Sequence, residues 1–212
     1  MHFFARALIA LTALLPLACT AADAEKYQAG EHYKSVRVPQ PPADPGKIEV
    51  MEVFAYSCPH CFQLEGKVEQ WLAKKPGDVV FVRQPHTLGA PANQVRNKAM
   101  YTAQMLGGFE KFHKALFGAI HGQGRVMATV EEVREVFVKS TGLKAEDFDG
   151  AYSSFMIDSR LRIGEKTVQD LGIASVPTIV VDGKWSVPNG ANVFSIVDFL
   201  VEKARKERGK SR

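Results

Sequence analysis

The sequence predicts an α/β protein in which a block of helices interrupts a smaller α/β domain. An apolar, β-prone run over residues 47–56 leads directly into a helical pattern over residues 59–74. A second apolar run at residues 79–83 completes a strand–helix–strand unit. From about residue 90 to 170 no convincing strand pattern occurs, and apolar residues recur at helical spacing. This change of period predicts both the fold class and the interruption.

Strand signals return near the C-terminus. Residues 176–181 form an apolar strand pattern, Asp182-Gly183 is a hairpin turn signal, and residues 184–187 are its expected partner. A final helix is predicted over residues 192–206. The predicted order is therefore strand–helix–strand, a helical block, and then strand–strand–helix.

These patterns divide the chain into domains. We assign residues 23–89 and 171–212 to the α/β domain, and residues 90–170 to an inserted helical domain whose aromatic side chains form its core. The helical stretches of the insertion are marked by apolar residues within Val95–Leu106, Phe109–Phe117, Val130–Phe137 and Phe148–Phe155.

Local signals predict where several elements begin and end. Thr129 and Glu132 have the spacing of a capping box at a helix N-terminus. A helix over residues 157–171 is expected to end at Gly172, because glycine accommodates the left-handed backbone that often follows a helix. A short edge strand is expected at residues 35–38.

The N-terminus has the pattern of a secretory signal peptide. Arg6 supplies the positive charge, residues 7–18 are an apolar run too short to span a membrane, and small residues end at Ala22. We expect cleavage near Ala22, export from the cytosol, and no stable membrane insertion of the mature chain. Lipidation of Cys19 is the alternative, but Pro16 stands where a lipoprotein signal usually has leucine.

The charge of the chain is concentrated at its C-terminus. The formal net charge is +4, and residues 202–212, with six basic and two acidic side chains, account for all of it. A nucleic-acid-binding protein is expected to carry a basic face on its fold. We therefore predict no nucleic-acid partner, and in the absence of a long exposed apolar segment we expect a monomer.

The chemistry centres on Cys58-Pro59-His60-Cys61, which follows the first strand and opens the helix. Unpaired backbone N–H groups and the helix dipole at a helix N-terminus favour negative charge, and the thiolate is the reactive form of cysteine. Cys58 is therefore the predicted nucleophile. Cys61 lies one turn inside the helix and is the predicted resolving partner, more buried than Cys58.

Two other interpretations of the cysteine pair are weaker. A structural disulfide across four residues would constrain very little chain. A zinc site would need two further ligands, and His113 and His121 lie far along the chain. We therefore predict neither a metal nor a cofactor.

Three neighbours of the pair are candidates for supporting roles. His60 can stabilise a thiolate at Cys58, or it can be an exposed side chain without effect. Glu52 is an acid within an apolar strand: it either lies beneath the motif with a raised pKa and relays protons, or faces solvent. Pro177 follows Val176 at the start of a strand, where proline is awkward unless it lies at an edge, and the residues alone leave open whether the bond is cis.

Together, these features resemble the DsbA family of bacterial periplasmic thiol oxidases. The matching features are Cys58-Pro59-His60-Cys61 after Phe54-Ala-Tyr-Ser57, Glu52, Val176-Pro177-Thr178, the helical insertion and the signal peptide. The resemblance covers the mature chain. It implies a thioredoxin fold, a central mixed sheet flanked by helices, with an inserted all-helical domain and a cis bond before Pro177.

The resemblance also implies roles. Cys58 and Cys61 form the redox-active disulfide, Pro59 and His60 tune its potential, Val176 and Pro177 bind the substrate backbone, and Glu52 handles the proton of Cys61. The implied partners are reduced, unfolded secreted proteins and a quinone-linked membrane oxidase of the DsbB type.

Other functions on such a fold are a disulfide isomerase, a thiol reductase, a peptide-binding chaperone or a zinc-binding module. An isomerase of this compartment resembles a dimer with an added N-terminal domain, and few residues precede the first strand here. A reductant more typically has Gly-Pro between its cysteines. The intact cysteine pair argues against a chaperone, and the missing ligands argue against a zinc module.

Overall fold

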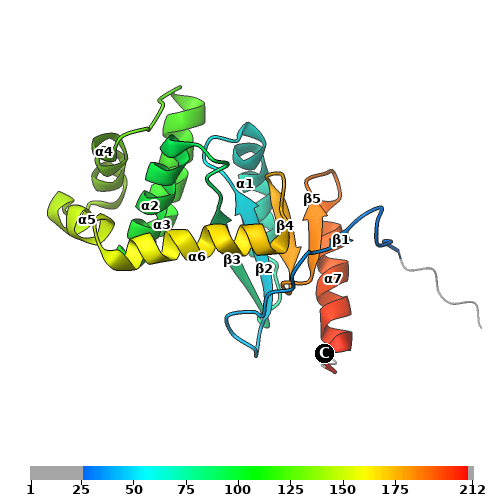
Figure 1. The fold of residues 1–212 in the computed structure, drawn as a ribbon. Coiled ribbons are helices and arrows are strands. Elements are labelled where there is room, and N and C mark those ends of the chain that lie inside the picture. Colours follow the sequence, from blue (N-terminus) through cyan, green and yellow to red (C-terminus); the bar gives the residue numbers. More distant parts are fainter. Residues whose placement is uncertain (1–25, 210–212) are drawn as a thin grey trace, which may run out of the picture.

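The computed structural model describes residues 26–209, and its centre is a five-stranded mixed sheet (Figure 1). The strands lie in the order β1-β5-β4-β2-β3; β3 is parallel to β2, and the other neighbours are antiparallel. The elements in chain order are β1 Lys34–Ser35, β2 Ile48–Phe54, α1 Pro59–Leu72, β3 Val79–Pro85, α2 Pro91–Leu106, α3 Phe109–Phe117, η1 Gly118–Gly122, α4 Val130–Thr141, α5 Ala145–Tyr152, α6 Phe155–Leu171, β4 Thr178–Val181, β5 Trp185–Pro188 and α7 Val193–Glu207. This is the predicted thioredoxin-like arrangement of a mixed sheet and helices.

Strand β2 lies inside the sheet, between β4 and β3, and is largely apolar on both faces. Val50 packs in one core with α1 and α7, whereas Val53 packs in another with α6 on the opposite face. Both side chains are fully buried. An apolar strand buried on both sides is typical of a sheet covered by helices on each face.

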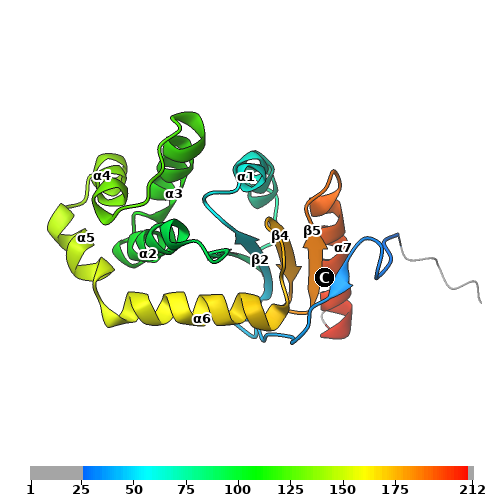
Figure 2. The ribbon, with the colours of Figure 1, turned by 45° about the horizontal axis from the view of Figure 1, so that its top comes forward.

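Helices α2 to α5 and η1, here called the helical segment, lie between β3 and α6 in the chain and form their own core. Phe112, Phe137 and Phe148 are fully buried there. The same core includes Phe54, Tyr56 and Cys61 from the sheet side of the molecule. The long helix α6 runs along both the helical segment and the sheet (Figure 2). The end of β2 and the first turn of α1, which carry the cysteine motif, are therefore packed against the helical segment.

Several predicted signals are confirmed. Thr129 and Glu132 make both hydrogen bonds of a capping box at the start of α4. Gly172 ends α6 with φ 73°, in the left-handed region. Asp182 and Gly183 have φ of 54° and 61°, as a tight hairpin turn between two strands requires.

Other boundaries differ from the prediction for local reasons. Strand β1 ends at Ser35 because the backbone N–H of Arg37 donates to Leu171 at the end of α6, which takes the chain out of the sheet. Phe155 begins α6 instead of ending the preceding helix, since Ser154 caps α6 by accepting from Ile157 N–H. Strand β4 begins at Thr178, after a proline that has no N–H to donate.

The predicted signal peptide and Cys19 lie outside the described residues. Within residues 26–209, no helix combines the length and the apolarity needed to cross a bilayer. The proposed domain boundaries at residues 90 and 170 stay predictions, because α6 packs on both parts of the molecule.

Candidate active site

The two cysteines lie at the start of α1, and their burial differs. Cys58 is the N-cap residue, and its backbone N–H donates to Ala55 O at 3.0 Å. Pro59, His60 and Cys61 form the first turn of the helix. Cys58 is half-buried, Cys61 is fully buried, and both are free thiols. The helix therefore presents one accessible sulfur at its N-terminus and shields the other.

The loop before β4 lies against Cys58. The Val176–Pro177 peptide bond is cis, and the Cys58 thiol donates to Val176 O at 3.6 Å. Val176 is half-buried and Pro177 is buried. The fold therefore brings the cysteine motif together with Val176 and Pro177, which the chain separates widely. Pro59 and His60 are exposed in the first turn of the helix.

Glu52 lies beneath α1 and is fully buried, which excludes the solvent-facing alternative. It shares a strand face with Val50, which packs under α1. Among the described residues neither carboxyl oxygen has a hydrogen-bond partner, and the nearest charge is Arg83 Nε at 3.6 Å. Burial, reinforced by the Glu65 carboxylate, raises the pKa of Glu52 to about 8 despite Arg83. Glu52 is therefore a buried carboxylic acid that holds its proton near neutral pH.

The Cys61 thiol also resists ionisation. Burial raises its pKa above the ordinary value, and the neighbouring Cys58 and Glu52 add to this effect. A thiolate formed at Cys61 consequently takes up a proton readily, and Glu52 is an acid within electrostatic reach.

A chain of polar side chains continues from Glu52 toward the helical segment. Arg83 lies opposite Glu52 in the parallel β2–β3 pair and donates to Glu65 at 3.0 Å. His113 Nε2 faces Glu65 Oε1 at 3.3 Å, and His113 Nδ1 lies 2.8 Å from the hydroxyl of Tyr56. Burial opposes ionisation of Glu65, but His113 and Arg83 hold its pKa below the usual value. Burial lowers the pKa of His113 and raises that of Tyr56. These pKa shifts favour an ionised Glu65, a neutral His113 that accepts from the Tyr56 hydroxyl, and a protonated Glu52.

His113 and His121 lie far from the cysteines in the sequence, but the fold brings both into contact with Tyr56, two residues before Cys58. His121 Nε2 lies 2.8 Å from Tyr56 O, and its ring stacks on Phe62, next to Cys61. The helical segment folds back over the motif and brings both histidines to it. Within the described residues, no group of three or more His, Cys, Asp or Glu side chains is arranged to hold a metal ion.

The sequence contained weak signals for these additional residues. Arg83 ends the apolar run of β3 as a lone charge, and His113 lies among the aromatic residues of α3. A charge in a buried strand and a histidine on an apolar helix face both need partners. Which partners they find depends on tertiary packing.

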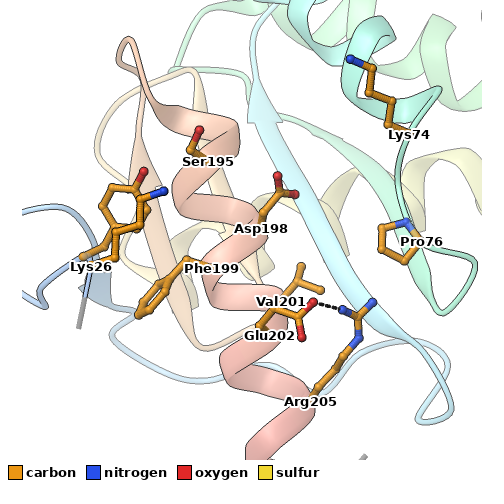
Figure 3. A pocket seen from close by; sticks show the side chains of 10 residues that line it. Lys26, Lys74, Pro76, Ser195, Asp198, Phe199, Val201, Glu202 and Arg205 are labelled. Carbon is orange, nitrogen blue, oxygen red and sulfur yellow. Dashed lines mark hydrogen bonds and ion pairs between the residues drawn. The ribbon is translucent and has the colours of Figure 1, made fainter. Parts of the chain in front are cut away.

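A hollow of about 500 Å³ lies at the other end of α1, where Lys74, Asp198 and Arg205 contribute to its lining (Figure 3). The 14-residue helix separates it from Cys58 by about 20 Å. Arg205 is already paired there with Asp78 and Glu202. The hollow is therefore a site separate from the cysteines.

Comparison with known proteins agrees with this geometry. Residues 49–201 match the DSBA-like thioredoxin domain. The thiol:disulfide interchange protein DsbA of Pseudomonas aeruginosa is 36% identical over 203 residues, covering 92% of this chain and 95% of that protein. Its counterpart in Azotobacter vinelandii is 36% identical and covers 83% of this chain and 84% of that protein.

Solved structures agree as well. The crystal structure of Pseudomonas aeruginosa DsbA is 34% identical, with a TM-score of 0.81 over 88% of this chain and 99% of that one. The oxidoreductase DsbA of Xylella fastidiosa is 29% identical, with a TM-score of 0.77 over 84% of this chain and 97% of that one. The family match, the identity and the paired cysteines at the start of α1 lead to one conclusion: this chain belongs to the DsbA-like thioredoxin-domain family and is a thiol:disulfide oxidoreductase.

Proposed function

We propose that the protein is a periplasmic thiol oxidase that passes a Cys58–Cys61 disulfide to reduced, unfolded secreted proteins. The observation that carries the proposal is the asymmetry of the two thiols. Cys58 is half-buried at the N-terminus of α1 and contacts Val176 O, whereas Cys61 is buried below it. An incoming substrate thiolate therefore reaches Cys58 first.

The exchange proceeds through two sulfur attacks. A substrate thiolate attacks Cys58 Sγ of the oxidised protein, which forms a mixed disulfide and releases Cys61 with the electron pair of the broken bond. A second substrate thiolate then attacks the substrate sulfur of the mixed disulfide. The substrate leaves with its disulfide, Cys58 leaves as a thiolate, and two electrons remain on the cysteine pair.

Glu52 supplies the proton that Cys61 needs. Because burial disfavours a thiolate at Cys61, protonation of this leaving sulfur drives the first step forward. Glu52 carries a proton near neutral pH and lies within electrostatic reach of Cys61. After the transfer, Glu52 recovers a proton from water.

The remaining predicted residues bind the substrate or tune the reduction potential of the cysteine pair. Val176 and Pro177 pair with the backbone of an extended substrate beside Cys58. His60 and Pro59, exposed in the first turn of α1, adjust the balance between thiolate and disulfide. A membrane oxidase of the DsbB type, linked to quinone, regenerates the disulfide, and residues 1–22 direct export.

A redox titration against glutathione tests this function. We expect an oxidising couple, because a helix N-terminus that stabilises the Cys58 thiolate favours the reduced form. A strongly reducing couple would contradict the oxidase role and favour a reductase on the same fold.

Two single-cysteine variants identify the attacking sulfur. With oxidised glutathione, Cys61→Ser should form a mixed disulfide at Cys58, observed by mass spectrometry. Cys58→Ser, whose remaining thiol is buried, should react at least about tenfold more slowly. Equal rates in the two variants would contradict the assignment of Cys58 as the reactive sulfur.

A further inference from the structure

Tyr56, two residues before Cys58, is held at both its side chain and its backbone by histidines of the helical segment. Its hydroxyl lies 2.8 Å from His113 Nδ1, and its carbonyl oxygen lies 2.8 Å from His121 Nε2. A carbonyl only accepts, so His121 Nε2 carries the hydrogen and donates it. Tyr56 is fully buried, and both partners lie in elements that follow α2 in the chain.

His121 contacts the residues that flank the cysteine motif in the chain, Tyr56 before it and Phe62 after it. Its ring stacks on Phe62, with 5.1 Å between centroids and an interplanar angle of 14°. Phe62 directly follows Cys61, and Tyr56 precedes Cys58 by two residues. His121 lies on η1, a π-helical turn over Gly118–Gly122. Such turns are rare and occur frequently at functional sites.

Ser57, the residue immediately before Cys58, has a third contact with the helical segment. Asn93 Nδ2 donates to Ser57 Oγ at 3.0 Å, and Arg96 Nη1 holds Asn93 Oδ1 at 2.6 Å. Asn93 and Arg96, both on α2, are buried. The short loop between β2 and α1 is therefore fixed by side chains from α2, α3 and η1.

We propose that His121 is a positioning residue for the redox pair, acting through the Tyr56 carbonyl. In the oxidised protein the Cys58–Cys61 bond itself restrains the loop. In the dithiol form that restraint is gone, and the loop depends on its hydrogen bonds to keep Cys58 at the helix N-terminus and beside Val176 O. Loss of the His121 hydrogen bond should therefore destabilise the reduced form more than the disulfide, and make the protein a weaker oxidant.

The inference rests on the proposed oxidase function, and a matched pair of variants tests it separately. His121→Phe keeps an aromatic ring against Phe62 but loses the donor, whereas His121→Gln keeps an N–H donor but loses the stacking. The readouts are the equilibrium constant with glutathione and the midpoint of urea unfolding. We expect His121→Phe to shift the redox equilibrium roughly fivefold toward the disulfide form, the size of effect that one hydrogen bond has. His121→Gln should stay within about twofold of wild type.

Three results would overturn the proposal: an unchanged equilibrium in His121→Phe, a larger shift in His121→Gln than in His121→Phe, or a lower unfolding midpoint without a redox shift. The last result would assign His121 a purely structural role. His121→Met, which also lacks the donor and adapts to irregular space, replaces the Phe variant if that variant fails to fold. A reducing couple in the wild-type protein itself would refute the oxidase function instead, so the two failures are distinguishable.

Discussion

The polar side chains near the two ends of α1 differ in whether their hydrogen-bonding groups have partners. At the C-terminal end, Trp71 Nε1 donates to Asp198 at 2.8 Å, Lys75 donates to Val79 O at 2.7 Å, and Arg205 is paired with Asp78. Beneath the N-terminal end, polar side chains are buried without complete partners. Within residues 26–209, five of the seven buried side-chain atoms that lack a hydrogen bond belong to Glu52, Glu65, Arg83 and His113, and the other two belong to Asn97.

The paired polar groups at the C-terminal end of α1 stabilise the fold, whereas the unpaired groups beneath its N-terminal end lie where the reaction takes place. A buried group without a partner costs stability, so such groups are normally few and scattered. Here they gather beside two thiols that must gain and lose protons. A carboxyl with no hydrogen bond is free to exchange its proton with a neighbour, whereas the carboxylate of Asp78 accepts from Arg205 at both oxygens and holds the fold together.

The largest expected effect is at Glu52. Its pKa rises from an ordinary value near 4.5 in the unfolded chain to about 8 in the folded one. The contribution of Glu52 to stability should therefore be greatest below about pH 4.5 and fall as pH rises toward 8, because only the unfolded state releases this proton in that window. Glu52→Gln should remove this loss, a few kcal/mol at about 1.4 kcal/mol per pKa unit. Urea unfolding of both reduced proteins between pH 4.5 and 8.5 measures it.

The same substitution at Glu49 is the control for the reaction. Glu49 is also buried in β2, but it accepts from Ala43 N–H near the opposite end of the strand. Glu52→Gln should slow oxidation of a reduced peptide and flatten its pH profile, while Glu49→Gln leaves both unchanged. If the two variants behave alike, the contrast between the ends of α1 has no bearing on the chemistry.

A smaller effect is expected at the other end of the helix, at Asp198 (Figure 3). Asp198→Ala leaves the indole N–H of Trp71 without its partner and should lower the free energy of unfolding by about 1–3 kcal/mol. Asp198→Asn keeps an acceptor oxygen and should lose less. Both variants should keep the wild-type redox equilibrium with glutathione; a shift would mean that this end also takes part in the reaction.

The smallest effect compares two helix N-termini. At α4 the hydroxyl of Thr129 and the carboxylate of Glu132 satisfy backbone N–H groups, whereas α1 begins at Cys58, whose side chain makes no such capping hydrogen bond. Thr129→Ala should lower the unfolding free energy by about 1 kcal/mol with unchanged disulfide exchange. Thr129→Ser, which retains the cap, should match wild type in thermal unfolding. A redox change in Thr129→Ala would link this distant cap to the cysteines.

Prediction from the sequence worked where a short stretch decides the outcome. The strand before Cys58, the helix after it, the capping box at Thr129 and the turn at Asp182-Gly183 all depend on residues within a few positions of one another. Boundaries failed where a distant segment intervened, as when Arg37 pairs with the end of α6 and ends β1 early.

By itself, the sequence determined the fold class, the redox pair and its place at a helix N-terminus, since side-chain periodicity and turn residues act locally. Only the tertiary structure decided that Glu52 meets Arg83, that Val176 faces Cys58, and that His113 and His121 hold Tyr56. The physical reason is that burial and charge arise from groups that the fold brings together. A carboxyl in an apolar strand has no determined pKa until the neighbouring strand and the covering helix supply its surroundings.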